Sequence, residues 1–203
     1  KAGIMVFLDV VYNHFGPDGN YLYVYARSGF FNHEHKTPWG DAIKYENKVV
    51  REFFIQNALY WLDKYHFDGL RLDAVHVIKD NSKPDILEEI AIRVNEYFKN
   101  KRKIYLVLEN DDNRARYIKQ NKDLKPEYYI AQWNDDFHHS LHSLLTEEKT
   151  GYYQDFGHFN QLVKALKESF VYTGQYSGYR KKRHGSSSKH LPPSRFVAFS
   201  QNH

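Results

Sequence analysis

Three charged residues, Arg71, Asp73 and Glu109, lie in or directly after short apolar segments, and their types suit nucleophilic and acid–base chemistry. Arg71 and Asp73 are two positions apart, so on a β-strand they would point to the same face. An arginine beside a carboxylate favours the ionised form of the acid, which a nucleophilic or charge-stabilising aspartate requires. Glu109 follows the all-apolar run 104–108. Partial burial there would favour the protonated form of the carboxyl and suit it to donate a proton.

Asp73 and Glu109 could act as a pair if the strands before them are neighbours in a parallel sheet. Neighbouring parallel strands bring their ends together, and glycoside hydrolysis with retention uses two carboxyl groups about 5–5.5 Å apart. The alternative is that Arg71 and Asp73 form a structural ion pair and that Glu109 is a solvated loop acid. The spacing alone leaves both interpretations open.

Five short apolar runs, each followed by polar residues, predict the strands that would carry these groups. They are residues 4–8, 69–72, 104–108, 128–131 and 195–199. Runs of this kind are typical of strands buried on both faces in a parallel sheet. Helical patterns lie between them at residues 49–65, 86–98, 137–145 and 159–170, the second opened by residues 82–85, which resemble a capping box.

The alternation of strands and helices predicts an α/β fold. The polar residues at the predicted strand ends are Asp9, Asp73, Glu109, Asn134 and Asn202. In a (β/α)₈ barrel, catalytic residues lie at the carboxyl ends of the strands. A doubly wound open sheet would also bind ligands there, but no glycine-rich phosphate-binding fingerprint follows any of these strands, and this favours the barrel.

The composition excludes several classes of protein. Of 203 residues, 41% are hydrophobic and 17% aromatic, so the chain is not of a disordered or collagen-like type. It contains no cysteine, which excludes disulfide frameworks and thiolate catalysis. It also has no apolar run near the roughly 18 residues that indicate a membrane span. The charge sum, 29 − 25 = +4, is too mildly basic to identify a nucleic-acid-binding protein.

Four motifs, in order, resemble the conserved regions of the α-amylase superfamily. They are residues 9–14 (DVVYNH), 69–76 (GLRLDAVH), 108–110 (LEN) and 200–203 (SQNH). The resemblance covers essentially the whole chain. It implies that residues 1–203 form one incomplete catalytic domain, with approximately strands 3 to 7 of a (β/α)₈ TIM barrel and without strands 1, 2 and 8.

The resemblance also implies a role for each matching residue. Asp73 would be the nucleophile that forms a glycosyl-enzyme, and Glu109 the acid/base. Arg71 would keep Asp73 ionised and oriented, and Asp9 would orient the site through hydrogen bonds. The remaining residues that we expect to contact the substrate are His14, His203, Tyr12 and Asn202.

Further segments resemble one subfamily, the malto-oligosyltrehalose trehalohydrolases. They are residues 109–113, 132–139, 173–177 and 179–185. The implied reaction is hydrolysis, with retention, of the α-1,4 bond next to a terminal trehalose unit of malto-oligosyltrehalose, in trehalose biosynthesis. The alternatives are a transglycosylase similar to glycogen branching enzyme, or an inactive carbohydrate-binding fragment. The expected partners are the malto-oligosaccharide substrate and the remainder of the parent barrel. We expect no cofactor, metal, nucleic acid or membrane, and a cytoplasmic location.

The two ends of the chain suggest a piece of a longer protein. Lys1 is preceded by no initiator methionine or signal peptide, and His203 follows directly after an apolar run. In the superfamily, the fourth region continues from Asn-His into an aspartate that stabilises the transition state. We therefore expect an aspartate directly after His203, and no hydrolase activity from these 203 residues alone.

Three other features have two interpretations each. His138 and His142 have the i, i+4 spacing of a metal-binding pair, but no HExxH pattern accompanies them, so polar contacts are favoured. The basic stretch 180–184 would bind a phosphate-rich polymer or, as we favour, form a solvated lid. Trp39 and Trp133 would stack on sugar rings or fill the core.

Overall fold

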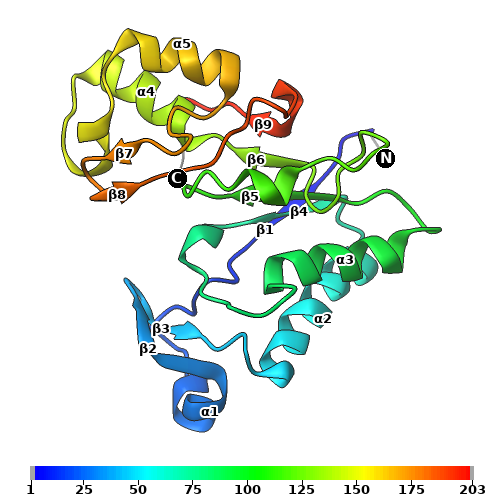
Figure 1. Cartoon of the computed structure of the whole chain (residues 1–203). Helices are drawn as coiled ribbons and strands as arrows, with labels where there is room; N and C mark the ends of the chain where they lie inside the picture. Colours follow the sequence, from blue (N-terminus) through cyan, green and yellow to red (C-terminus); the bar gives the residue numbers. More distant parts are fainter. Residues whose placement is uncertain (1–2, 202–203) are drawn as a thin grey trace. The chain divides into compact units, whose positions relative to one another are not determined.

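The computed structural model describes residues 3–201 and divides into two compact units, one ending at Leu108 and the other beginning at Glu109 (Figure 1). Each unit contains parallel strands and helices, so the α/β class predicted from the sequence is confirmed. The candidate residues Asn202 and His203 lie outside the described residues.

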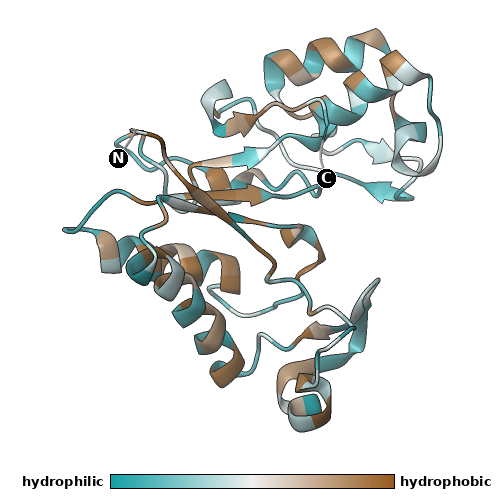
Figure 2. Cartoon of the chain, turned by 180° about the vertical axis from the view of Figure 1, so that it is seen from behind, coloured by the Kyte–Doolittle hydropathy of each residue, from teal (hydrophilic) through white to brown (hydrophobic). Residues whose placement is uncertain are grey.

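A parallel sheet forms the centre of the first unit. Its strands are β1 (Phe7–Val10), β4 (Gly69–Leu72) and β5 (Tyr105–Glu109), with β4 in the middle. The register pairs Asp9 with Arg71 and Leu72 with Leu108. All four residues of β4 are buried, as the prediction of a strand buried on both faces requires. Figure 2 shows the hydrophobic residues of these strands in brown.

The first residue of β4, Gly69, is needed for close strand packing. A Cβ atom at this position would lie 2.5 Å from Cε1 of Phe7 and closer still to the carbonyl oxygen of Tyr105. Real side chains do not tolerate such distances, and the obstructing Tyr105 atom belongs to the backbone. Glycine at position 69 therefore allows β1 and β5 to approach β4 from both sides.

Strand β1 differs from its prediction. The sequence predicts a strand at residues 4–8 buried on both faces, but the structure begins the strand at Phe7 and leaves the preceding apolar residues exposed, Ile4 at 78% and Met5 at 56%. Among the described strands of this unit, β1 pairs with β4 alone. One edge of β1 is therefore uncovered, which explains why its residues are less buried than those of β4.

Two helices pack beside each other in the first unit, α2 (Lys48–Lys64) and α3 (Ile86–Phe98) (Figure 1). The side chain of Asn47 caps α2 by accepting a hydrogen bond from the Val49 amide. The capping box of α3 consists of Asp85 and Glu88, three residues later than the predicted one at Ser82. A helix starting at Ser82 would require helical backbone at the residue before Pro84, which the proline ring disfavours.

The segment between residues 15 and 46 contains regular structure. Its elements are α1 (Leu22–Phe30), β2 (Phe31–Thr37) and β3 (Gly40–Ile43). Strands β2 and β3 form an antiparallel hairpin, which follows α1 directly (Figure 1). A short 3-10 helix, Val75–Val77, follows β4.

The second unit combines a pair of parallel strands, two helices and a small hairpin. Its elements are β6 (Ala131–Trp133), α4 (Asp135–Thr146), α5 (Phe159–Glu168), β7 (Tyr176–Ser177), β8 (Lys182–Arg183) and β9 (Phe196–Val197), with 3-10 helices at Ala115–Ile118, Gly151–Asp155 and Pro193–Arg195. β6 and β9 are parallel, whereas β7 and β8 are antiparallel. The helices α4 and α5 contact each other, and a core of Phe156, Ala165 and Val171 is packed by Phe137 and Tyr172.

No helix within residues 3–201 is long and apolar enough to cross a bilayer.

Candidate functional site

The carboxyl ends of β1 and β4 bring together three of the predicted site residues, Asp9, Arg71 and Asp73. Nη1 of Arg71 donates hydrogen bonds to both carboxylate oxygens of Asp9, at 2.7 and 2.6 Å, and to Oδ1 of Asp73 at 3.3 Å. The side chains are 9% exposed for Arg71, 15% for Asp73 and 51% for Asp9. A mostly buried guanidinium therefore stands between two carboxylates, and such charge-assisted bonds hold their partners firmly.

Asn13 is a second neighbour of Asp73 that the sequence reasoning missed. It is 2% exposed, and its Nδ2 donates to the backbone oxygen of Asp73 at 2.8 Å and to Oδ2 at 3.4 Å. Asp73 also donates its amide hydrogen to the Val10 carbonyl, and Ala74 follows with a φ of 40° in the left-handed region. The only sequence signal for Asn13 is its place beside His14 in the motif at residues 9–14.

The imidazole of His14 lies flat against the indole of Trp39. The ring centroids are 4.1 Å apart and the ring planes differ by 11°, while Nδ1 of His14 contacts Oδ1 of Asn13. Burial lowers the pKa of His14, and the charge of Asp73 opposes this shift. Trp39 is 45% exposed, so it is not a core residue.

Tyr12, expected to contact the substrate, lies instead in the core of the first unit. Its side chain is 4% exposed, its hydroxyl donates to Oδ1 of Asn57 at 2.8 Å, and its ring meets Phe54 edge-on at 5.2 Å. Burial raises the pKa of the Tyr12 hydroxyl. This placement differs from the predicted substrate contact because the hydroxyl is already paired within the protein.

Glu109 is the last residue of β5 and is partly buried. Leu72 pairs with Leu108, so Asp73 and Glu109 are the next residues of two neighbouring strands. The backbone beyond Glu109 is held by Gln132, whose Nε2 donates to the Asn110 carbonyl at 3.0 Å.

The histidines of α4 have protein neighbours. Nδ1 of His138 lies 3.0 Å from the Ser200 carbonyl oxygen, and Nε2 of His142 lies 2.8 Å from Oε2 of Glu148. His139 is buried against Tyr152, and this burial lowers its pKa to about 3. Within residues 3–201 there is no group of three or more histidine, aspartate or glutamate side chains placed to hold a metal ion.

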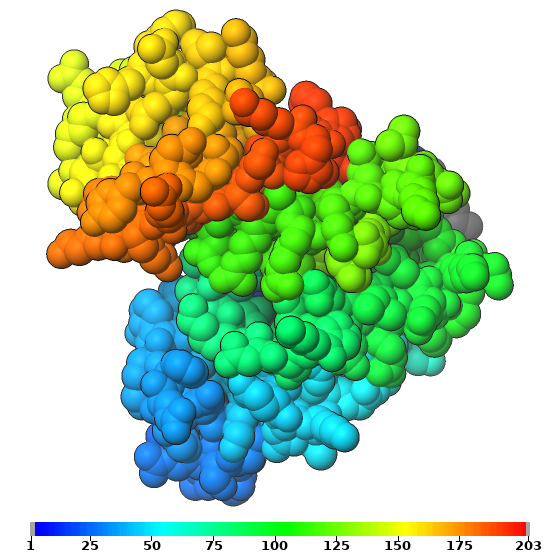
Figure 3. All heavy atoms as spheres, in the orientation of Figure 1, coloured from blue at the N-terminus to red at the C-terminus, as the bar shows by residue number. Residues whose placement is uncertain are grey.

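The basic stretch 180–184 belongs to the hairpin of β7 and β8 at the surface of the second unit, orange in Figure 3. Arg180 pairs with Asp111, two residues after Glu109. Lys182 and Arg183 are exposed. Arg180 thus holds the hairpin loop to Asp111, whereas Lys182 and Arg183 face solvent.

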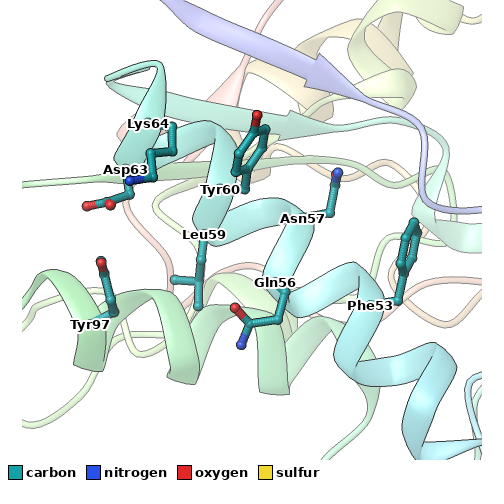
Figure 4. A pocket seen from close by; sticks show the side chains of 8 residues that line it. All are labelled: Phe53, Gln56, Asn57, Leu59, Tyr60, Asp63, Lys64 and Tyr97. Carbon is teal, nitrogen blue, oxygen red and sulfur yellow. The ribbon is translucent and has the colours of Figure 1, made fainter.

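A separate groove lies on α2 and α3 of the first unit (Figure 4). Phe53, Asn57 and Tyr60 of α2 and Tyr97 of α3 help to line it. It contains none of the predicted site residues.

The arrangement of parallel strands and helices is similar to that of α-amylase family structures. The crystal structure of a candidate alpha amylase from Salmonella typhimurium matches 98% of this chain with a TM-score of 0.93 and 42% identity, over 34% of its own length. The resemblance to the α-amylase superfamily predicted from the sequence is thereby confirmed.

The more specific resemblance is to malto-oligosyltrehalose trehalohydrolases. That of Saccharolobus solfataricus is 45% identical over 100% of this chain, and that of Arthrobacter ramosus is 40% identical over 99%. The chain spans about 35% of the length of each of these relatives. A shorter match, 44% identical over 36% of the chain, is to a 1,4-alpha-glucan branching enzyme of Synechocystis. No protein-family model matches the chain.

Proposed function

We propose that the chain is part of the catalytic barrel of an enzyme that cleaves the α-1,4 bond next to the terminal trehalose unit of malto-oligosyltrehalose and releases trehalose. The observation that carries this proposal is the placement of Asp73 beside Arg71 and Asn13 at the end of β4, within a chain similar over its whole length to trehalohydrolases. Residues 1–203 would supply strands 3 to 7 of the barrel, and the other strands would come from the rest of the protein.

The proposed reaction has two steps. In the first, a carboxylate oxygen of Asp73 bonds to the anomeric carbon, the glycosidic C–O bond breaks, and Glu109 gives its proton to the leaving oxygen. In the second, Glu109 takes a proton from water, the water oxygen bonds to the anomeric carbon, and Asp73 leaves as a carboxylate. Two inversions give net retention. The register that makes Asp73 and Glu109 successors of the paired Leu72 and Leu108 supports their assignment as the two carboxyl groups.

The surrounding residues have supporting roles in this proposal. Arg71 donates a hydrogen bond to the Asp73 carboxylate and orients it for attack in the first step, and Asp9 fixes the guanidinium from its other side. His14 would hydrogen-bond a sugar hydroxyl, a contact that helps most when it strengthens as charge develops in the transition state. His203 and Asn202, which lie outside the described residues, are proposed as further substrate contacts.

Transfer to a sugar hydroxyl is the second candidate, because the chain also matches a branching enzyme over 36% of its length. The glycosyl-enzyme on Asp73 would be the same, and only the acceptor in the second step would differ.

A chimera tests these proposals. In it, residues 1–203 replace the matched segment of the Saccharolobus solfataricus trehalohydrolase, and the chimera is incubated with malto-oligosyltrehalose or with amylose. Release of trehalose that is lost in the Asp73→Asn variant supports hydrolysis. New α-1,6 branches on amylose without trehalose release support transfer. A folded chimera that gives neither product contradicts both.

A further inference from the structure

A buried carboxylate outside the proposed catalytic machinery fastens the hairpin of β2 and β3. The Asp41 side chain is only 3% exposed, and its Oδ2 accepts a hydrogen bond from the hydroxyl of Tyr23 at 3.2 Å. Asp41 also pairs with Lys36 and His33. Hydrogen bonds from Lys36 and His33 lower the pKa of Asp41 to about 2, so it is ionised throughout the neutral range.

Two of these partners lie at a bulge in β2, His33 within it and Lys36 directly after it. Asn32 pairs with Ala42 and Lys36 pairs with Asp41, so residues 33–35 have no counterpart on β3. A bulge bends and twists the strand that carries it. Asp41 therefore joins His33, at the start of the bulge, to Lys36, the first residue beyond it.

The tight turn between β2 and β3 carries Trp39. Thr37 Oγ1 donates to the carbonyl of Gly40 at 3.0 Å and accepts from the amide of Trp39 at 3.2 Å, while Gly40 has a φ of +140°. These hydrogen bonds fix the conformation of the turn, whereas its direction depends on the two strands of the hairpin. It places the Trp39 indole flat on His14, with a centroid distance of 4.1 Å.

Contacts continue from the stacked ring to the proposed nucleophile. Nδ1 of His14 contacts Oδ1 of Asn13. The side-chain Nδ2 of Asn13 donates to the backbone oxygen of Asp73 at 2.8 Å and to its carboxylate oxygen Oδ2 at 3.4 Å. A short series of contacts therefore leads from the hairpin to the Asp73 carboxylate, all within the first unit.

We propose that Asp41 is a positioning residue that holds the Trp39 indole against His14 and thereby keeps His14, Asn13 and Asp73 in one arrangement. Asp41 touches none of the proposed reacting atoms and acts through the hairpin. The catalytic part of this inference rests on the proposed function, whereas the stacking part does not.

The stack has a spectroscopic signature, because a protonated imidazole in contact with an indole quenches the indole fluorescence. The chain has three tryptophans, so subtracting the emission of a Trp39→Phe variant isolates the signal of Trp39. On acidification from about pH 8 to about pH 4, across the histidine range, the Trp39 emission should fall. A His14→Gln variant should lose this fall, because no imidazole then faces the indole.

In Asp41→Asn, the pH-dependent quench should be lost or reduced severalfold. Glu34→Gln is the matched control, since it removes one carboxylate from the same bulge and should retain the full quench. If circular dichroism shows that Asp41→Asn does not fold, Lys36→Met replaces it. The Lys36 side chain is 69% exposed, and this substitution removes only one of the partners of Asp41. An undiminished quench in the folded variant overturns the proposal.

The catalytic part is measured in the chimera. Asp41→Asn should lower kcat by about tenfold or more with little change in KM, as expected when a reacting group is misplaced by an ångström or less. Unchanged kcat despite a lost stack overturns the positioning role. If the unsubstituted chimera is inactive while the quench behaves as expected, the proposed function fails and the stacking part stands.

Discussion

Arg71 binds Asp9 more closely than it binds Asp73: its Nη1 lies 2.7 and 2.6 Å from the two oxygens of Asp9 and 3.3 Å from Oδ1 of Asp73. The guanidinium is therefore anchored by the more exposed carboxylate and directed at the less exposed one. This geometry lets Arg71 stabilise the charge of Asp73 without neutralising it in a tight, exclusive pair.

Replacing the shared guanidinium tests this relationship. Arg71→Lys in the chimera should lower kcat by roughly tenfold to a hundredfold, because a flexible ammonium does not hold its charge at one fixed position between the two carboxylates as the rigid guanidinium does. Arg93→Lys is the matched control, since Arg93 pairs with the half-exposed Glu52 at the surface and such pairs contribute little. Equal activities for the two variants would show that Arg71 has no special role.

Asn13→Asp would place a second carboxylate where an amide now lies 3.4 Å from Oδ2 of Asp73. Like charges this close favour protonation of one of the two acids, so less Asp73 would be ionised at neutral pH. We expect a kcat that is lower than that of Asn13→Ser and that recovers as the pH rises. A pH–rate profile of the two variants measures this, and parallel profiles would contradict the expectation.

Asp136 predicts a pH dependence of stability in the second unit. Its Oδ2 accepts hydrogen bonds from the amides of Val171 and Tyr172 and from Asn113, yet burial raises its pKa from 3.8 to about 6. The folded state then binds more protons than the unfolded state between those values. The free energy of unfolding therefore falls as pH rises from about 4 to about 6, by roughly 3 kcal/mol in total.

Asp136→Asn should remove this pH dependence of the free energy of unfolding. Urea titrations of the chain measure the free energy of unfolding of Asp136→Asn and of the unsubstituted protein. From about pH 4 to about pH 7, the stability of the variant relative to the unsubstituted protein should increase by a few kcal/mol. Other titrating groups are common to both proteins and cancel in the difference. A difference that does not depend on pH would show that Asp136 titrates normally.

Gly69→Ala should destabilise the first unit. The added methyl group would collide with the Tyr105 carbonyl oxygen and the Phe7 ring, and overpacking of this kind costs about 1–3 kcal/mol. Gly16→Ala is the control, because no atom lies within 4 Å of a Cβ at that position. Chemical denaturation of both variants measures the effect, and equal midpoints would contradict the close approach of the strands.

The parts of the site that depend on local periodicity could be predicted from the sequence. Arg71 and Asp73 lie two positions apart at the end of a buried strand, and the structure brings their side chains together as the two-residue repeat of a strand requires. The helix following Pro84 was also predictable, although its cap lies at Asp85 rather than Ser82.

The parts of the site that depend on contacts between residues distant in the sequence could not be predicted. The bond between Arg71 and Asp9 joins residues 62 positions apart, and it follows from the register of β1 on β4. Tyr12 lies beyond the end of β1, where strand alternation no longer determines direction, and burial against Phe54 took it away from the predicted substrate contact. The stack of Trp39 on His14 required a hairpin with a bulge that no local pattern indicates.

The central claim, that Asp73 is the nucleophile of a retaining hydrolase, is tested most directly by trapping the glycosyl-enzyme. A Glu109→Gln variant of the chimera, given an α-maltosyl fluoride with a good leaving group, should form the intermediate and hydrolyse it slowly, because its general base is missing. Peptide mass spectrometry should then find a maltosyl adduct on Asp73. An adduct on another residue, or fluoride release without any adduct and with inversion at the anomeric carbon, would contradict the mechanism.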